Sequence, residues 1–161
     1  MMITQRGEKM QAQNLINQKI GLVLTQIGLL SRVFALQSFA ANVSEITPEQ
    51  FTVLSALYEN GDLYQRQISA ITLKDRANIT RIISILESQG FVVRKTESQG
   101  RQIQKVSITE KGRAMYEKAL PYILDIWAKT IEGIDEVEMN ECFSTLQKIR
   151  VNLQNNTTLN L

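Results

Sequence analysis

The stretch from Asp75 to Gly90 reads DRANITRIISILESQG, and the rest of the chain is organised around it. Asp75 is a residue type that caps helix N-termini, and Gly90 is the type that ends helices in a left-handed conformation. The isoleucines and the leucine between them recur at helical spacing and predict one apolar face. The opposite face is polar and carries Arg76, Asn78, Thr80, Arg81 and Ser84.

This polar face has the side chains that a helix uses in the major groove of DNA. Arginine can donate two hydrogen bonds to guanine, asparagine can pair with adenine, and serine or threonine can reach a base or a phosphate. An ordinary solvated helix can show the same face. The residues on either side of the stretch have to decide between the two interpretations.

The residues before Asp75 predict two further helices. Thr47-Pro48-Glu49-Gln50 predicts a capped helix start, with threonine as the cap and proline in the first turn. A short helix from Tyr64 to Ile71 follows, and only Thr72-Leu73-Lys74 separates it from Asp75. Two short helices joined this closely, the second basic on one face, are typical of a helix-turn-helix.

The residues after Gly90 predict a β-hairpin. Residues 91–96 and 102–108 are rich in β-branched residues, with a turn between them. A basic hairpin beside a basic helix can touch the minor groove and the flanking phosphates, whereas an ordinary charged hairpin is the alternative. The basic residues of this predicted wing are Arg94, Lys95, Arg101 and Lys105.

Charge is concentrated in the middle of the chain. The 161 residues carry a net charge of +2, but residues 74–113 hold 9 Lys+Arg and 4 Asp+Glu, a local net charge of +5. The residues before this segment have a net charge of zero, and those after it have a net charge of −3. A localised basic segment suits a polyanionic partner, and a basic patch that only favours solubility is the alternative.

The two ends of the chain predict long helices. From Glu8 to Ala41 the apolar residues step by three and four, which is a heptad-like stripe that needs a large partner surface. Further helices are predicted after Thr109 and after Asp135. The predicted fold class is therefore mainly α with a small β-hairpin, an α+β arrangement. It divides into a dimerisation helix (1–46), a winged helix-turn-helix lobe (47–113) and C-terminal dimerisation helices (114–161).

The order of these parts resembles the MarR family of bacterial transcription regulators. The similarity covers about Thr47 to Arg113 and rests on the stretches ITPEQFTVLSAL, NITRIISILESQGFVVRK and VSITEKGR. The resemblance implies an obligate homodimer that binds a pseudo-palindromic operator, usually as a repressor. It also implies that the helix-face residues lie over bases or phosphates, and that Gln65, Arg66 and Lys74 hold the DNA backbone.

Two positions depart from the family pattern. Family wings often carry Asp-x-Arg, but the corresponding positions here are Gly100, Arg101 and Gln102, so the acid is missing and the arginine comes one residue early. Tyr64 stands where the family usually has a small N-capping residue.

Several kinds of chemistry are excluded by composition. The chain has no histidine, which excludes imidazole mechanisms and histidine-containing zinc sites. The one cysteine, Cys142, lies on the apolar face of the last helix and is expected to be a buried thiol rather than a redox sensor. We expect no enzyme activity, no metal and no cofactor. We expect no apolar run of the length of a membrane span, so a cytoplasmic protein without membrane contact is predicted.

The expected function is sequence-specific transcriptional regulation. The expected partners are double-stranded DNA and a second copy of the chain. The resemblance adds a small anionic or aromatic effector, for which the polar or aromatic residues on the dimer helices are candidates, although core packing is the alternative for each aromatic. The alternative function is a winged-helix module whose basic face docks an acidic protein. The candidate effector residues are Arg32, Phe34, Phe39 and Trp127.

Overall fold

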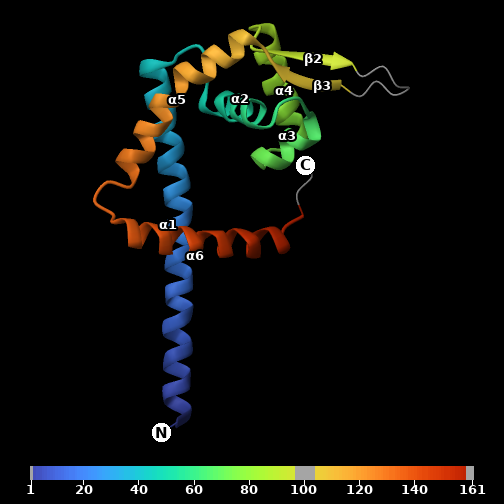
Figure 1. Cartoon of the computed structure of the whole chain (residues 1–161). Helices are drawn as coiled ribbons and strands as arrows, with labels where there is room; N and C mark the ends of the chain where they lie inside the picture. Colours follow the sequence, from blue (N-terminus) through green and yellow to red (C-terminus); the bar gives the residue numbers. More distant parts are fainter. Residues whose placement is uncertain (1, 97–103, 159–161) are drawn as a thin grey trace.

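The mainly helical architecture predicted from the sequence is confirmed. A computed structural model of the chain describes residues 2–96 and 104–158 (Figure 1). The elements follow in the order α1 (Met2–Asn42), α2 (Pro48–Asn60), β1 (Leu63–Tyr64), α3 (Gln65–Thr72), α4 (Arg76–Ser88), β2 (Val92–Thr96), β3 (Gln104–Ile108), α5 (Glu110–Thr130) and α6 (Glu136–Asn155).

The start of α2 follows from its capping residues. The Thr47 hydroxyl accepts a hydrogen bond from the Gln50 backbone N–H at 3.2 Å, and the Gln50 side-chain oxygen accepts one from the Thr47 N–H at 2.7 Å. Pro48 occupies the first turn, where a missing N–H costs nothing. This is the capping box that the sequence predicted.

The wing is part of a three-stranded antiparallel sheet with the order β1-β3-β2. The predicted hairpin pairs Val92 with Ile108, and the far edge of β3 pairs Val106 with Leu63 of β1. Strand β1 is not predictable from the sequence, because a strand of two residues has no pattern of its own and forms only where a partner edge is available. The wing tip, with the Gly100-Arg101-Gln102 positions, lies outside the described residues.

The hydrophobic core lies inside the lobe formed by α2, α3, α4 and the sheet. The end of α1 reaches it with Phe39, and α5 reaches it with Tyr116 and Ala119. The Phe51 ring stacks on the Tyr116 ring at a centroid distance of 5.2 Å. The fully buried large side chains at its centre are Leu54, Leu57, Ile68, Ile79, Ile83 and Leu86.

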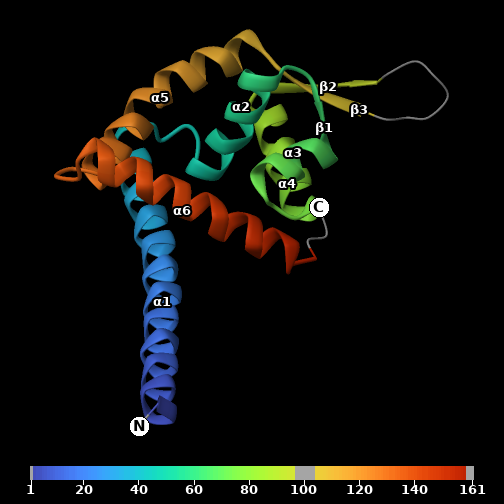
Figure 2. The ribbon, with the colours of Figure 1, turned by 60° about the horizontal axis from the view of Figure 1, so that its bottom comes forward.

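Helix α6 and most of helix α1, apart from its C-terminal end, lie outside this core. Helix α1 projects from the lobe as a long rod, and the N-terminus lies at its far end (Figures 1 and 2). Helix α6 has no buried residue. The expectation that Cys142 is buried is wrong for this chain by itself, because its thiol lies on this unpacked helix and is exposed. The large apolar side chains that stay exposed on the two helices include Leu15, Ile20, Leu22, Ile27, Leu29, Leu30, Val137, Phe143, Leu146 and Leu153.

Residues 14–42 of α1 are long and apolar enough to cross a membrane, judged by length and composition alone. The most apolar 18-residue window in this segment has a mean hydropathy of 1.5, and none of that window is buried. The expectation that no segment approaches a membrane span is therefore wrong by this measure, because Lys19 and Arg32 are the only charged residues in the segment. Helices that pack against other protein helices meet the same criterion.

Candidate nucleic-acid interface

Helix α4 is held firmly at both ends. The Asp75 carboxylate accepts a hydrogen bond from the Asn78 backbone N–H at 2.8 Å, which confirms the predicted N-cap. At the other end Gly90 has a φ of 76°, and the Phe91 N–H donates to the Leu86 carbonyl at 2.9 Å. A residue with a Cβ is strained at that φ, so glycine is the residue that suits this helix end.

The fixed helix presents the predicted polar residues together on its outer face. Arg76, Thr80, Arg81 and Ser84 are exposed, and Asn78 is half-buried. One nitrogen of the Arg81 guanidinium lies 3.4 Å from the Asn78 side-chain oxygen, to which it donates. The inward face of the same helix supplies core residues such as Ile79 and Ile83. The core therefore sets which side chains of α4 point outward.

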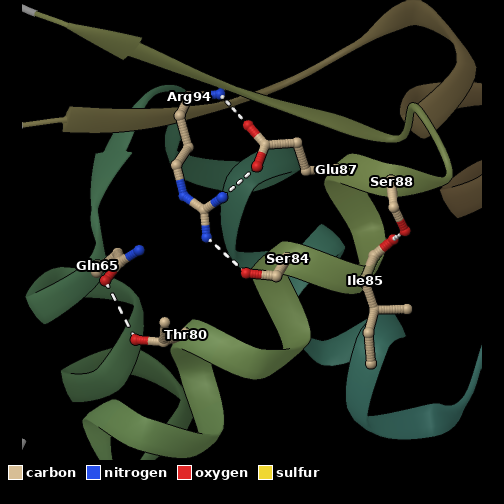
Figure 3. A network of polar contacts seen from close by, with 7 residues as sticks. All are labelled: Gln65, Thr80, Ser84, Ile85, Glu87, Ser88 and Arg94. Atoms are coloured by element: carbon tan, nitrogen blue, oxygen red, sulfur yellow. Dashed lines mark hydrogen bonds and ion pairs between the residues drawn. The ribbon is translucent and has the colours of Figure 1, made fainter.

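Helix α3 lies beside α4, and α3 together with the turn after it contributes the residues expected to hold the DNA backbone. Arg66 is exposed, while Gln65 and Lys74 are half-buried. The Thr80 hydroxyl lies 3.4 Å from the Gln65 side-chain oxygen, which links the two helices at their outer surface (Figure 3). The Tyr64 backbone N–H donates to the Gln67 side chain at 2.9 Å, so the bulky residue at this helix start still leaves a partly capped end.

The basic residues of the wing differ in their surroundings. The Lys95 ammonium is 3.4 Å from the Asp62 carboxylate and stays well exposed. The Lys105 ammonium lies 5.1 Å from the centre of the Tyr64 ring, a cation–π arrangement. Arg101 lies outside the described residues.

Arg94 is placed differently from the expectation of an outward wing residue. Its side chain is only 18% exposed and turns toward α4, where the guanidinium pairs with the Glu87 carboxylate (Figure 3). A second guanidinium nitrogen donates to the Ser84 hydroxyl at 3.0 Å. The alternation of strand β2 could have indicated this, because Arg94 shares the inward face with buried Val92.

A close joint connects the end of α4 to the start of α5. The Thr109 hydroxyl donates to the Gly90 carbonyl at 2.8 Å and accepts from the Gly112 N–H at 3.0 Å. The Lys111 ammonium donates to the Gln89 carbonyl at 2.7 Å. A Cβ on Gly112 would lie 2.1 Å from the Phe91 carbonyl oxygen, so only glycine fits. This contact explains why the stretches NITRIISILESQGFVVRK and VSITEKGR each contain a glycine, because Gly90 and Gly112 meet here.

A groove of about 280 Å³ lies behind the first turns of α4, between α1 and α2. At its edge the Arg32 guanidinium lies 3.4 Å from the Glu49 carboxylate. The groove combines two guanidinium groups with an apolar wall. Its lining includes Arg32, Leu36, Glu49, Asn78, Arg81, Ile82 and Ile85.

The four residues predicted to line an effector pocket are not brought together. Arg32 lines the groove just described, and Phe34 lines a separate hollow against the end of α5. Phe39 is buried in the core, with its ring 5.9 Å from that of Phe51. Trp127 is 51% exposed on α5. Helical spacing placed these residues on neighbouring helices but could not give the rotation of each helix.

Comparison with known proteins agrees with this geometry. A sequence model of the MarR family matches residues 44–102, which include α2, α3, α4 and β2. Over these residues the chain is similar in sequence to the MarR family. The resemblance predicted from the motifs is confirmed over these residues, and the fold is a winged helix.

One relative and two solved structures illustrate the similarity to other regulators. The HTH-type transcriptional regulator YybA of Bacillus subtilis is 25% identical over 133 residues, which cover 82% of this chain and 89% of YybA. BpsR of Bordetella bronchiseptica, whose DNA binding is regulated by 6-hydroxynicotinic acid, superposes with a TM-score of 0.75 at 23% identity, covering 82% of this chain and 98% of BpsR. CouR of Rhodococcus jostii RHA1, solved with p-coumaroyl-CoA, superposes with a TM-score of 0.71 at 24% identity, covering 81% of this chain and 90% of CouR. At these identities the two structures support the fold.

Proposed function

We propose that the chain is a MarR-family transcriptional regulator, which acts in the cytoplasm as a homodimeric repressor, binds a pseudo-palindromic operator and responds to a small effector. It has no enzyme activity in this proposal. The observation that carries the proposal is the outer face of α4. This face holds Arg76, Thr80, Arg81 and Ser84 exposed on a helix whose opposite face is locked into the core.

Electrostatics supports DNA as the partner of this face. The segment that contains α4 and the wing carries a net charge of +5, while the residues after it carry −3. Phosphate neutralisation by such a segment supplies most of the affinity for DNA, and contacts to base edges add the sequence preference. We therefore assign the base contacts to α4, and the phosphate contacts to Arg66, Lys74 and the exposed basic residues of the wing.

The uncovered helices support a homodimer. The apolar side chains of α1 and α6 face solvent in the single chain, for example Leu29 at 60% exposure and Phe143 at 61%. Exposed apolar surface of this extent marks an interaction site. A second copy related by a two-fold axis would cover both helices. It would also present two α4 helices to successive major grooves about one DNA turn apart.

The groove behind α4 is our candidate effector site. Arg32 and Arg81 can hold a carboxylate, while Leu36 and Ile82 offer an apolar wall to an aromatic ring. A ligand bound to Arg81 there would compete with DNA for the same guanidinium. The compound that regulates BpsR, 6-hydroxynicotinic acid, is an aromatic carboxylic acid of this kind, which supports testing it as a first probe.

The function is tested by selecting genomic fragments with the purified protein and repeating the binding with Arg81→Ala. Loss of a base contact of this kind costs about 1–3 kcal/mol, so we expect at least a roughly five-fold weaker operator complex. Arg113→Ala is the matched control, because it removes the same charge from α5, where Arg113 lies over the Tyr58 ring at 5.7 Å. Equal affinity of the Arg81 variant and the wild type would remove Arg81 from the interface. Failure of the wild type to select any sequence would favour the alternative of a protein-docking module.

A further inference from the structure

Arg94 forms a bridge between the wing and α4. The Glu87 carboxylate accepts a hydrogen bond from the Arg94 backbone N–H at 3.2 Å and also pairs with the Arg94 guanidinium. The same guanidinium donates to the Ser84 hydroxyl oxygen at 3.0 Å (Figure 3). Glu87 therefore fixes the direction in which Arg94 points, and Arg94 in turn reaches Ser84 on the outer face of α4.

In this bridge the Ser84 hydroxyl accepts a hydrogen bond and keeps its own proton available for donation. A serine hydroxyl has one proton to donate and two lone pairs that accept. Arg94 occupies one lone pair of Ser84 and so restricts the directions of the remaining lone pair and of the proton, and no acceptor among the described residues takes that proton. Because Ser84 is exposed, the free donor faces the space in which DNA would lie.

Thr80, one helical turn earlier, has the opposite polarity. Its hydroxyl donates to the Arg76 carbonyl at 2.8 Å and has the Gln65 side-chain oxygen within 3.4 Å as a second acceptor. Its proton is therefore used inside the protein, and only its lone pairs remain for a partner. Phosphate oxygens accept and do not donate, so the Thr80 oxygen can pair only with an amino group of adenine or cytosine.

We propose that Arg94 is a positioning residue that sets Ser84 as a hydrogen-bond donor toward DNA and thereby makes Ser84 a determinant of operator sequence. Ser84 then selects an acceptor edge at one position of each half-site: the N7 or O6 of guanine, the N7 of adenine or the O4 of thymine. Thr80 selects an amino group at a neighbouring position. The inference rests on the proposed function, since it requires that α4 reads DNA.

The test uses the full-length protein and the operator obtained by fragment selection, together with a set of operators that each carry one changed base pair. Ser84→Ala removes the donor. Arg94→Lys keeps the charge beside Glu87 but has a single nitrogen, which cannot pair with Glu87 and Ser84 in the forked geometry of arginine. We expect each variant to lose about 3- to 10-fold discrimination at the same single position of the half-site. We also expect the Ser84→Ala/Arg94→Lys double variant to lose no more than either single variant.

Arg113→Lys is the matched control, because it makes the same substitution away from α4, and it should leave the base preference unchanged. If Arg94 were only structural, Arg94→Lys would lower the melting temperature and weaken every operator equally, without a change at one position. That result overturns the proposal, and so does retention of full discrimination by Ser84→Ala.

Because Ser84 is exposed, its alanine variant is expected to fold even if an Arg94 variant does not, and it tests the Ser84 contact by itself. If the wild type selects no sequence, the proposed function fails first; if it selects one and the variants keep it, only the Arg94 inference fails.

Discussion

The lobe that contains α4 covers its apolar side chains within the chain, whereas α6 and most of α1 leave theirs exposed. Both carry apolar stripes at helical spacing. In the lobe these stripes meet one another, and Leu57, Ile68 and Ile83 are fully buried. On α6 no side chain is buried, and most of α1 is equally open. An apolar stripe therefore predicts that a helix has a partner, but it does not say whether the partner lies in the same chain.

The largest effect on the free energy of unfolding is expected for a substitution in the core of the lobe. Ile83→Ala removes a fully buried side chain on the inward face of α4. Such changes leave a cavity and lower the free energy of unfolding by about 2–5 kcal/mol. Urea unfolding followed by circular dichroism measures the loss. Ile71→Ala, at an apolar side chain of α3 that stays 50% exposed, is the control and should lower the free energy of unfolding far less; equal losses would mean that burial in the lobe does not set its stability as described.

A smaller effect on folding, but a clear one on assembly, is expected for Phe143→Glu on α6. A charge placed in the proposed dimer interface should weaken association by at least about 2 kcal/mol, the size of an interface hot spot. Sedimentation equilibrium should then show a shift from dimer to monomer, and operator affinity should fall with it. Cys142→Ser, a conservative change at the neighbouring position, is the control. A Phe143→Glu protein that remains fully dimeric would remove α6 from the interface.

The smallest effect on stability is expected for an ion pair that joins α5 to the connection between α1 and α2. The Lys118 ammonium on α5 pairs with Glu45, in the connection between α1 and α2, and holds the pKa of that carboxyl below its usual value. A lowered pKa in the folded state gives stability above the ordinary glutamate value of about 4.5, and this stability is lost as the pH falls through the folded value. The difference in melting temperature between the wild type and Lys118→Ala should therefore shrink on acidification. A difference that is independent of pH would mean that the pair is not formed in solution.

The sequence predicted the parts of the fold that depend on local chemistry. The caps at Thr47 and Asp75, the end of α4 at Gly90 and the two main strands were all expected, because each is specified by the residues at that position. Strand β1 was missed, since Leu63 and Tyr64 become a strand only through the far edge of β3.

The polar face of α4 could also be predicted, because helical periodicity alone separates it from the core. The role of Arg94 could not, because its partners Glu87 and Ser84 belong to another element. The effector residues were scattered for the same reason. Phe39 and Trp127 are both aromatic, but packing buries one and leaves the other exposed.

DNase footprinting of the wild-type protein on a selected fragment, at two salt concentrations, tests the central claim most directly. A homodimer that reads DNA with two α4 helices should protect a pseudo-palindrome whose half-sites lie about one DNA turn apart. Binding should also weaken steeply with salt, while the protected position stays the same. Protection without a preferred sequence that disappears at the higher salt concentration, or no protection at all, would contradict the account.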